Sequence, residues 1–507
     1  MPLLYQNPVI HSDYSDPDVI RTGDDFWMVA SSFHQLPGLP ILHSRDLIHW
    51  RIVNHVVKRL PSPEYDTPQP GKGIWAPSIR YHDGRFWVFY SLPDDGIFVA
   101  HATDPLGDWS EPYCLVAEPG WIDPCPFWDD DGRAWLIHAF AFSRSGVKNK
   151  LQLLEMTPDA RRVLDSGRII FDGTLSHPTL EGPKLYKRDG EYWIFAPAGG
   201  VRRGWQTVMR APSLLGPWHS RDVLHQGRSL VNGPHQGAWV ELKNKESWFF
   251  HFQDKGVYGR IVHLQPLRWM PDGWPQIGEP LEDGGPGQPV LRHKLPALPL
   301  SPCVLQTSDA FTDGHPGLQW QWQANPQPSW LMPDRNGLSL SCVPTPESIS
   351  LYHLPQLLLQ LFPAERFSVR TTLSLTEGLD GDEAGVAVYG QRFAALRMVR
   401  EARQVHLYFS NGWVDDRGAW HHNTMPIKTP ETPEGGTSVE LGFDVGYDGI
   451  VQFGYRKTGG EWQSVTPAFS AGAGKWIGAR MGIYARGRQE GQNGCAKFIS
   501  FDVTVKQ

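Results

Sequence analysis

The sequence predicts an all-β protein, with a five-bladed β-propeller followed by a C-terminal β-sandwich of jelly-roll type. Short runs rich in Trp, Tyr, Phe, Val and Ile alternate with Gly, Pro and Asp turn signals, and long helical periodicity is scarce. One strand pattern that carries a Trp recurs five times before residue 280 and then stops. The chain has 507 residues, which is too long for a single core, so at least two domains are expected.

The repeat consists of a turn followed by an aromatic strand. Its copies are GDDFWMVAS, DGRFWVFYS, DGRAWLIHA, DGEYWIFAP and NKESWFFHF. The shared tryptophans lie 48 to 60 residues apart, as expected for four-stranded blades: Trp27, Trp87, Trp135, Trp193 and Trp248. Because repeated units bury equivalent positions, we interpret these residues as packing between blades. The propeller is predicted over residues 1–297.

The remainder of the chain has a different character. The segment GGPGQPVLRHKLPALPLSP (284–302) has the Pro and Gly content and the lack of periodicity of a linker. Residues 305–507 contain alternating segments such as SVRTTLSLT, GVAVYG, QVHLYFS and ISFDVTV, without the Trp repeat. This pattern predicts the β-sandwich. The apolar stretch LPQLLLQLF (354–362) is expected to be one of its core strands.

Composition excludes several classes of protein. The 47 basic and 54 acidic residues give a formal charge of −7, which does not favour nucleic-acid binding. The five Cys are scattered and form no CxxC, so neither a disulfide framework nor a zinc site is expected. No run of about 18 apolar residues predicts a membrane span. The N-terminus lacks the pattern of a signal peptide, so we expect a cytoplasmic protein. The oligomeric state is left open.

Each blade has a chemically distinctive residue at nearly the same distance before its repeat Trp. Counting back 11 to 13 residues from the repeat Trp reaches the innermost strand, whose end lines the central channel of a propeller. The residues found there are Asp16, Trp75, Asp123, Glu181 and His235. Burying three carboxylates together is costly unless they perform chemistry or bind a cation.

Two kinds of site fit this set. Paired carboxylates with a third acid suit glycoside hydrolysis, in which one acid protonates the leaving oxygen and another activates water. Alternatively, the carboxylates could hold Ca²⁺, which takes several oxygen ligands. Trp75 favours a sugar ligand because its face can stack on a sugar ring, and Phe33 could form a second wall. We expect no cofactor to be required, with a structural calcium ion as the alternative.

Four segments resemble motifs of glycoside hydrolase family 43: NPVIHSDYSDPDVIR, GIWAPSIRYHDGRFWVFYS, WIDPCPFWDDDGRAWL and LEGPKLYKRDGEYWIF. The resemblance implies an inverting, exo-acting hydrolase that releases terminal β-D-xylosyl or α-L-arabinofuranosyl units from oligosaccharides derived from plant hemicellulose such as xylan. Two-domain family members with a C-terminal sandwich match the whole length. The resemblance also implies that Asp16 is the general base, Glu181 the general acid and Asp123 the third acid, which orients the general acid and tunes its protonation.

The resemblance extends to residues that would bind the sugar. It implies that Trp75 and Phe33 wall the subsite of the terminal sugar, and that Arg260, in KGVYGR, contacts sugar hydroxyls and acids. His235 matches an axial His that lies near a bound cation in some members. Lys184 departs from the pattern, because many β-xylosidases of the family have His after Glu-Gly-Pro. The choice between xylosyl and arabinofuranosyl units therefore stays open.

Two rival functions make different predictions. Propellers that act on fructosides carry an Arg-Asp-Pro triplet, and no Arg-Asp in this sequence is followed by Pro. A non-catalytic or calcium-structured carbohydrate-binding propeller would release no sugar from aryl glycosides. For the inverting mechanism, the Asp16 and Glu181 carboxyls are expected to lie roughly 6.5–9.5 Å apart, which leaves room for the attacking water.

Overall fold

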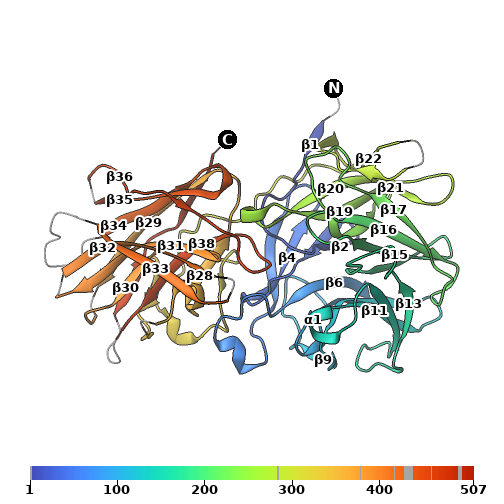
Figure 1. Ribbon diagram of the computed structural model, residues 1–507, viewed down its shortest axis with the longest axis horizontal. Coiled ribbons are helices and arrows are strands. Elements are labelled where there is room, and N and C mark those ends of the chain that lie inside the picture. The colour runs from blue at the N-terminus through green and yellow to red at the C-terminus, as the bar shows by residue number, and fades with distance from the viewer. Residues whose placement is uncertain are drawn as a thin grey trace.

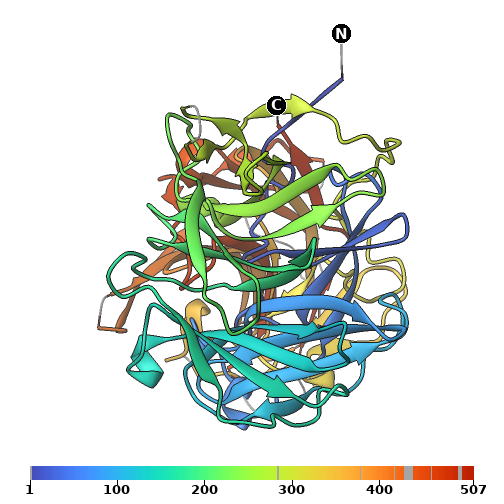
Figure 2. The same cartoon turned by 90° about the vertical axis from the view of Figure 1, so that its right-hand side faces the viewer.

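The computed structural model describes residues 3–282, 285–346, 348–376, 378–402, 404–415, 417–427, 438–457, 459–488 and 494–506. Two β-rich domains lie side by side, the propeller in blue to green and the sandwich in orange to red (Figure 1). Seen from the propeller side, the sandwich lies behind it (Figure 2). Over the described ranges, the only α-helix is the single turn α1 (Phe142–Ser145), and no helix is long and apolar enough to cross a membrane. The all-β prediction is confirmed.

The propeller contains five blades, each with four antiparallel strands in which sequential strands are neighbours. Blade I contains β2 (Asp18–Thr22), β3 (Asp25–Val29), β4 (Gly38–Ser44) and β5 (Arg51–Val57). Blade II contains β6 (Trp75–His82), β7 (Arg85–Leu92), β8 (Gly96–Ala102) and β9 (Tyr113–Val116). Blade III contains β10 (Trp121–Trp128), β11 (Ala134–Phe140), β12 (Lys150–Met156) and β13 (Arg168–Asp172). Blade IV contains β14 (Lys184–Arg188), β15 (Glu191–Ala198), β16 (Trp205–Ala211) and β17 (His219–Leu224). Blade V contains β18 (His235–Glu241), β19 (Ser247–Asp254), β20 (Arg260–Trp269) and β21 (Pro275–Ile277).

The repeated tryptophans are buried on the second strand of every blade and pack against the next blade, as the repeat predicts. Trp27 contacts Phe86 of blade II, with ring centroids 5.7 Å apart, and Trp193 contacts Trp269 of blade V at 4.9 Å. Trp248 of blade V shares a core cluster with Phe26 of blade I, which continues the apolar packing around the ring. Such edge-to-face aromatic pairs add to the energy of burial.

Short strands from both ends of the propeller sequence complete the ring. Strand β1 (Leu4–Gln6) pairs with β24 (Arg292–Lys294), and β22 (Glu279–Pro280) and β23 (Gly287–Gln288) extend blade IV. The Asn7 amide donates to the carbonyls of Leu264 and Val290 at 2.7 and 2.8 Å. The segment expected to be a plain linker therefore contributes β23 and β24, because its backbone finds open strand edges to pair with.

The sandwich has a seven-stranded and a nine-stranded sheet with an apolar core between them. The first sheet contains, in spatial order, β25 (Gln321–Trp322), β28 (Leu357–Leu361), β38 (Arg480–Arg486), β30 (Glu383–Tyr389), β31 (Arg392–Glu401), β32 (Gln404–Val414) and β33 (Trp420–Ile427). The second contains β26 (Leu331–Met332), β27 (Leu338–Ser341), β39 (Cys495–Phe498), β29 (Phe367–Thr376), β34 (Val439–Val445), β35 (Ile450–Lys457) and β36 (Gln463–Ser464), with β37 (Phe469–Ser470) on β35 and β40 (Asp502–Val505) on β29. The predicted core strand at 354–362 is β28, which is largely buried.

Backbone and side-chain bonds join the two domains. Leu36 and Trp322 exchange two backbone hydrogen bonds, of 2.9 and 2.6 Å. The Asn325 side chain accepts a bond from Leu60 N at 2.8 Å and donates to Leu60 O at 3.1 Å. Phe33 of the propeller is buried in one cluster with apolar residues of the sandwich, including Ile477. The sandwich is thus held next to the mouth of the propeller.

Candidate active site

A pocket of about 290 Å³ opens at the propeller axis. Six of the seven residues predicted for the site line it: Asp16, Phe33, Trp75, Asp123, Glu181 and Arg260. They come from all five blades, with Phe33 in the loop after β3, so the structure brings together residues that lie far apart in the sequence. The remaining residue, His235, contacts Glu181 but does not line the pocket.

The carboxylates stand where inner strands begin, and the backbone there is irregular. Asp16 and Asp123 have φ values of 56° and 57°, in the left-handed region that residues with a side chain seldom adopt. Glu181 is followed by Gly182, which has φ 58°. The register of β10 with β11 shifts between Ile122 and Cys125, next to Asp123. Such strained positions and bulges are frequent at functional sites, where they redirect side chains.

Asp16 is surrounded by hydrogen-bond donors. Its Oδ2 accepts bonds from the Ser15 and Ser31 hydroxyls at 2.8 and 2.6 Å. Its Oδ1 lies 3.4 Å from Nη1 of Arg260, which also donates to the Ser15 hydroxyl at 2.7 Å. These contacts fix the orientation of the Asp16 carboxylate, with two hydroxyl groups and a guanidinium beside it.

Asp123 has the opposite environment. Only 3% of the residue is exposed, and burial together with the carboxylates of Glu181 and Asp16 raises the pKa of Asp123 well above the ordinary range. A hydrogen bond from the Gly182 N–H to Oδ2, at 2.7 Å, and the charge of Lys184 act against this increase without cancelling it. The site therefore holds one carboxyl group that favours its neutral form.

Glu181 lies between the pocket and His235. Its Oε1 is 2.8 Å from Nε2 of His235, and 26% of its side chain is exposed. His235 was expected beside the sugar, but it is 0% exposed and does not belong to the pocket lining. Its ring packs against Phe252, with centroids 5.6 Å apart, and it orients the Glu181 carboxylate from behind. The next residue, Gln236, lines the pocket in its place.

One wall of the pocket comes from the sandwich domain, and sequence reasoning missed it. Trp476 lies in the loop between β37 and β38, is 44% exposed and lines the pocket. Its ring centroid is 6.3 Å from that of Trp75, and the Arg260 guanidinium lies 5.8 Å from its ring. The blade repeat holds no information about this residue, because it belongs to the other domain.

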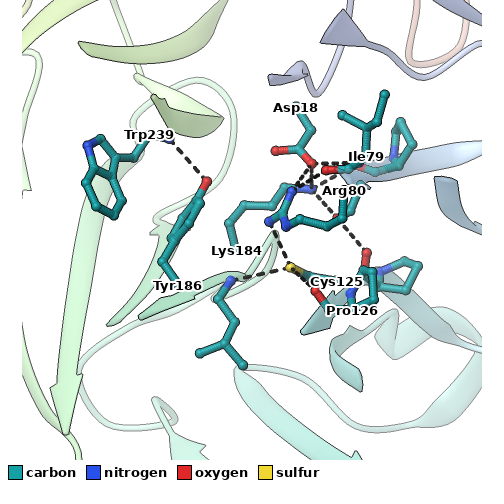
Figure 3. A network of polar contacts seen from close by, with 12 residues as sticks. Asp18, Ile79, Arg80, Cys125, Pro126, Lys184, Tyr186 and Trp239 are labelled. Atoms are coloured by element: carbon teal, nitrogen blue, oxygen red, sulfur yellow. Dashed lines mark hydrogen bonds and ion pairs between the residues drawn. The ribbon is translucent and has the colours of Figure 1, made fainter. Parts of the chain in front are cut away.

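A polar network joins residues that follow the carboxylates by two or three positions in the sequence, namely Asp18, Cys125 and Lys184 (Figure 3). Arg80 donates to Asp18 Oδ2 at 2.7 Å and to Cys125 Sγ at 3.0 Å. Lys184, which departs from the family pattern, donates to Pro77 O and the Ser78 hydroxyl at 2.7 and 2.6 Å and lies 3.8 Å from Asp18. Lys184 is buried and does not line the pocket, so it acts on the site through its charge.

The described part of the chain contains no group of three or more His, Cys, Asp and Glu side chains arranged to hold a metal ion. The calcium ion considered from the sequence stays a prediction.

Comparison with known families decides what this constellation belongs to. Residues 5–275 match the profile of the glycosyl hydrolases family 43, and residues 308–504 match that of the β-xylosidase C-terminal concanavalin A-like domain. The chain belongs to glycosyl hydrolase family 43. It is therefore a glycoside hydrolase, and a propeller that only binds carbohydrate is not favoured.

Relatives of this family 43 chain agree in length and fold. It is 36% identical to a Xylanibacter ruminicola protein whose name places it among the β-xylosidases, over 94% of this chain and 85% of that one. It is 29% identical to a non-reducing end α-L-arabinofuranosidase of Bacteroides ovatus, over 76% of this chain and 73% of that protein. The crystal structure of a xylan β-1,4-xylosidase from Bacillus halodurans has a TM-score of 0.85 and 27% identity, with 98% of this chain and 99% of that chain covered.

Proposed function

We propose that the chain removes single β-D-xylosyl or α-L-arabinofuranosyl residues from the non-reducing ends of oligosaccharides, with inversion at the anomeric carbon. The observation that carries the proposal is the convergence of Asp16, Asp123 and Glu181, each from a different blade, on one pocket. Relatives named for both activities support the choice of substrates.

Asp16 is the general base. It accepts hydrogen bonds from two serines and lies beside Arg260, and it takes a proton from a water molecule as that water attacks the anomeric carbon. In an inverting enzyme the water attacks from the face opposite the leaving group. The base and the acid must therefore stand on opposite sides of the sugar.

Glu181 is the general acid, and Asp123 assists it. The Glu181 carboxylate is one of the groups that raise the pKa of Asp123, so a proton on Asp123 relieves the repulsion between the two carboxyls. Glu181 is the more exposed of the two, and His235 orients it, so Glu181 gives the proton to the leaving oxygen. Before the next turnover Glu181 regains a proton from solvent, and Asp16 releases to solvent the proton that it took from the attacking water.

The shape of the pocket accounts for attack at chain ends. Its volume of about 290 Å³ is at the small end of ligand pockets, which are typically about 300–1,000 Å³. Phe33, Trp75 and Trp476 form aromatic walls that suit the faces of a sugar ring. A pocket walled in this way accepts a terminal residue more readily than the middle of a polymer.

The experiment compares two variants on two kinds of leaving group. Glu181→Ala should lose roughly 10²–10⁴-fold in kcat on xylobiose or an arabino-oligosaccharide. It should lose far less on a dinitrophenyl glycoside, because dinitrophenolate departs without a proton. Asp16→Ala should lose activity on both substrates equally, since both need the activated water. Equal losses for Glu181→Ala on both substrates would assign the acid to another residue, with Asp123 the next candidate.

Substrate class and stereochemistry need separate measurements. Assays with an aryl β-xyloside and an aryl α-L-arabinofuranoside compare the two terminal sugars directly, and no release from either would refute the proposed substrates. Proton NMR of the first product formed should show the anomer opposite to that of the substrate. Release mainly of oligosaccharides from xylan, with little monosaccharide, would contradict attack at chain ends.

A further inference from the structure

A second cavity, of about 310 Å³, lies on the sandwich domain and shares no lining residue with the active-site pocket. Side chains alternate along β31: Leu396 and Met398 point into the core between the sheets, whereas Arg397, Val399 and Glu401 line the cavity. The cavity therefore lies on the outer face of the seven-stranded sheet. Strands β30 to β33 and β38, and the segment that enters η4 (Leu351–His353), surround it.

The floor of this cavity is a buried ionic cluster. Glu383 is 0% exposed and pairs with Arg397 and with Arg486, the latter at 2.8 Å, and the Tyr484 hydroxyl donates to it at 3.1 Å. Gly385 stands opposite both Arg397 and Tyr484 in the sheet register and has no side chain to fill the space between them. A sandwich does not need such a costly cluster for its stability, because apolar residues of similar size are often at least as stabilising.

The walls offer polar groups beside flat rings. Tyr408 stands opposite Arg397, and its hydroxyl donates to Glu401 at 2.9 Å. The Ser410 hydroxyl accepts a bond from Arg397 Nε at 3.2 Å. Across the cavity lining, Trp420 contacts His422 with ring centroids 4.9 Å apart. Donors and acceptors are thus held in fixed positions next to partly exposed aromatic surfaces.

This chemistry selects one class of ligand. Three arginines and two glutamates nearly balance in charge, which does not favour a polyanion, and the polar floor does not favour an apolar molecule. Sugar rings present hydroxyls at their edges and C–H groups on their faces, which match fixed polar groups and aromatic rings. Glu383 is held by two arginines, so the cavity lacks the pair of independent carboxyls that hydrolysis needs.

We infer that this cavity is a second, non-catalytic carbohydrate-binding site, which holds an oligosaccharide of the kind whose terminal residues the propeller removes. The ligand class rests on the proposed function. The site itself rests on the cavity, its buried ionic floor and its aromatic wall.

Isothermal titration calorimetry of the full chain carrying Asp16→Asn, which slows hydrolysis, tests the inference with xylohexaose and arabinohexaose as probes. The expected result is two sites per chain for at least one probe. Adding Trp420→Ala or Tyr408→Ala should weaken one site at least tenfold and leave the other unchanged. The matched control is Trp413→Ala, because Trp413 lies on the neighbouring strand β32, is 42% exposed and does not line the cavity.

A single site with both probes, or two sites that neither variant weakens, would overturn the inference. In the otherwise native chain, Trp420→Ala should keep the parent's kcat/KM on the aryl glycoside that it cleaves, which shows that the variant is folded. If that variant fails to fold, Tyr408→Ala tests in its place whether one binding site is weakened.

The two proposals fail in distinguishable ways. Cleavage of an aryl glycoside together with a single binding site would leave the proposed function standing and remove the second site. Absence of cleavage together with a binding site weakened by Trp420→Ala would refute the proposed function and leave the second site standing.

Discussion

Asp13 and Arg480 form a buried ion pair between the two domains, with 2.8 Å between Asp13 Oδ2 and Arg480 Nη1. The same Asp13 carboxylate accepts a hydrogen bond from the backbone N–H of Arg260 at 2.7 Å and another from Gly478 at 2.8 Å. Arg260 lines the active-site pocket from the propeller, and Gly478 follows Trp476 closely in the sandwich loop. One carboxylate therefore fixes both domains where they meet at the pocket.

Arg480→Met should destabilise the protein strongly, because it leaves the Asp13 charge buried without its partner. Breaking one side of a buried pair costs about 3–5 kcal/mol. The melting temperature should fall, and KM for xylobiose should rise because the Trp476 loop loses an anchor. Lys58→Met, which removes the exposed pair with Asp108, is the control and should leave both unchanged. An unchanged melting temperature for Arg480→Met would show that the pair does not hold the domains together.

Asp123→Asn should raise the melting temperature at neutral pH while it lowers activity. Burial and two neighbouring carboxylates raise the pKa of Asp123 in the folded protein, so the folded state binds more protons than the unfolded state above the ordinary Asp range. Stability is then lost as pH rises from that range through the raised pKa. Removing the charge should flatten this part of the stability curve.

Melting temperatures of Asp123→Asn and its parent from pH 4 to pH 8 measure the effect, and the gain should grow with pH. Asp129→Asn is a control for which the opposite change in stability is expected. Burial acts to raise the pKa of Asp129, but hydrogen bonds from Lys187 and Tyr192 outweigh it, so that pKa is lowered. Asp129→Asn should therefore destabilise at neutral pH. A gain for Asp123→Asn that does not depend on pH would argue against a raised pKa.

The blade architecture can be predicted from the sequence because the same position must be packed in every blade. A Trp on the second strand of each blade fills the space to the next blade. The spacing of Trp27, Trp87 and their equivalents therefore predicts the number and length of the blades. The phase of Asp16, Asp123 and Glu181 within that period places them at the inner strand ends, and the structure brings these side chains into one pocket.

Features that depend on contacts between distant segments escaped prediction. Trp476 reaches the pocket only because the two domains dock, and no local sequence pattern predicts how domains dock. His235 occupies the expected phase, but a register shift between His235 and Gly237 sends Gln236 to the pocket and leaves His235 behind Glu181. Strand β23 pairs with β17 and β22, and β24 pairs with β1. Because their partners come from other parts of the chain, the sequence of these two strands alone resembles a linker.

Trp476→Ala should raise KM for xylobiose roughly tenfold, which corresponds to about 1.4 kcal/mol of binding energy. The change removes an aromatic wall and leaves the three carboxylates in place, so kcat should change less than KM. Steady-state kinetics on xylobiose, with Trp413→Ala as the control, measure both parameters. A fall in kcat with unchanged KM would instead mean that Trp476 positions the reacting groups.

Arg80→Met should lower the melting temperature by leaving Asp18 buried without its closest cation. Adding Asp18→Asn should restore part of the loss, because the uncompensated charge is then gone while an amide oxygen can still accept the bond from Ile79 N–H. Thermal unfolding of the parent, the single variant and the double variant provides the comparison. A double variant less stable than Arg80→Met would show that Lys184 alone neutralises Asp18 adequately.

The position of Trp476 in the chain has a consequence for synthesis. During translation the three carboxylates have all been added to the chain by residue 181, but Trp476, which completes their pocket, follows almost three hundred residues later. A nascent propeller therefore lacks one aromatic wall of this pocket until the sandwich has been synthesised and has docked. A chain that stops early, or whose sandwich fails to dock, retains the chemical groups but lacks the enclosure in which they act.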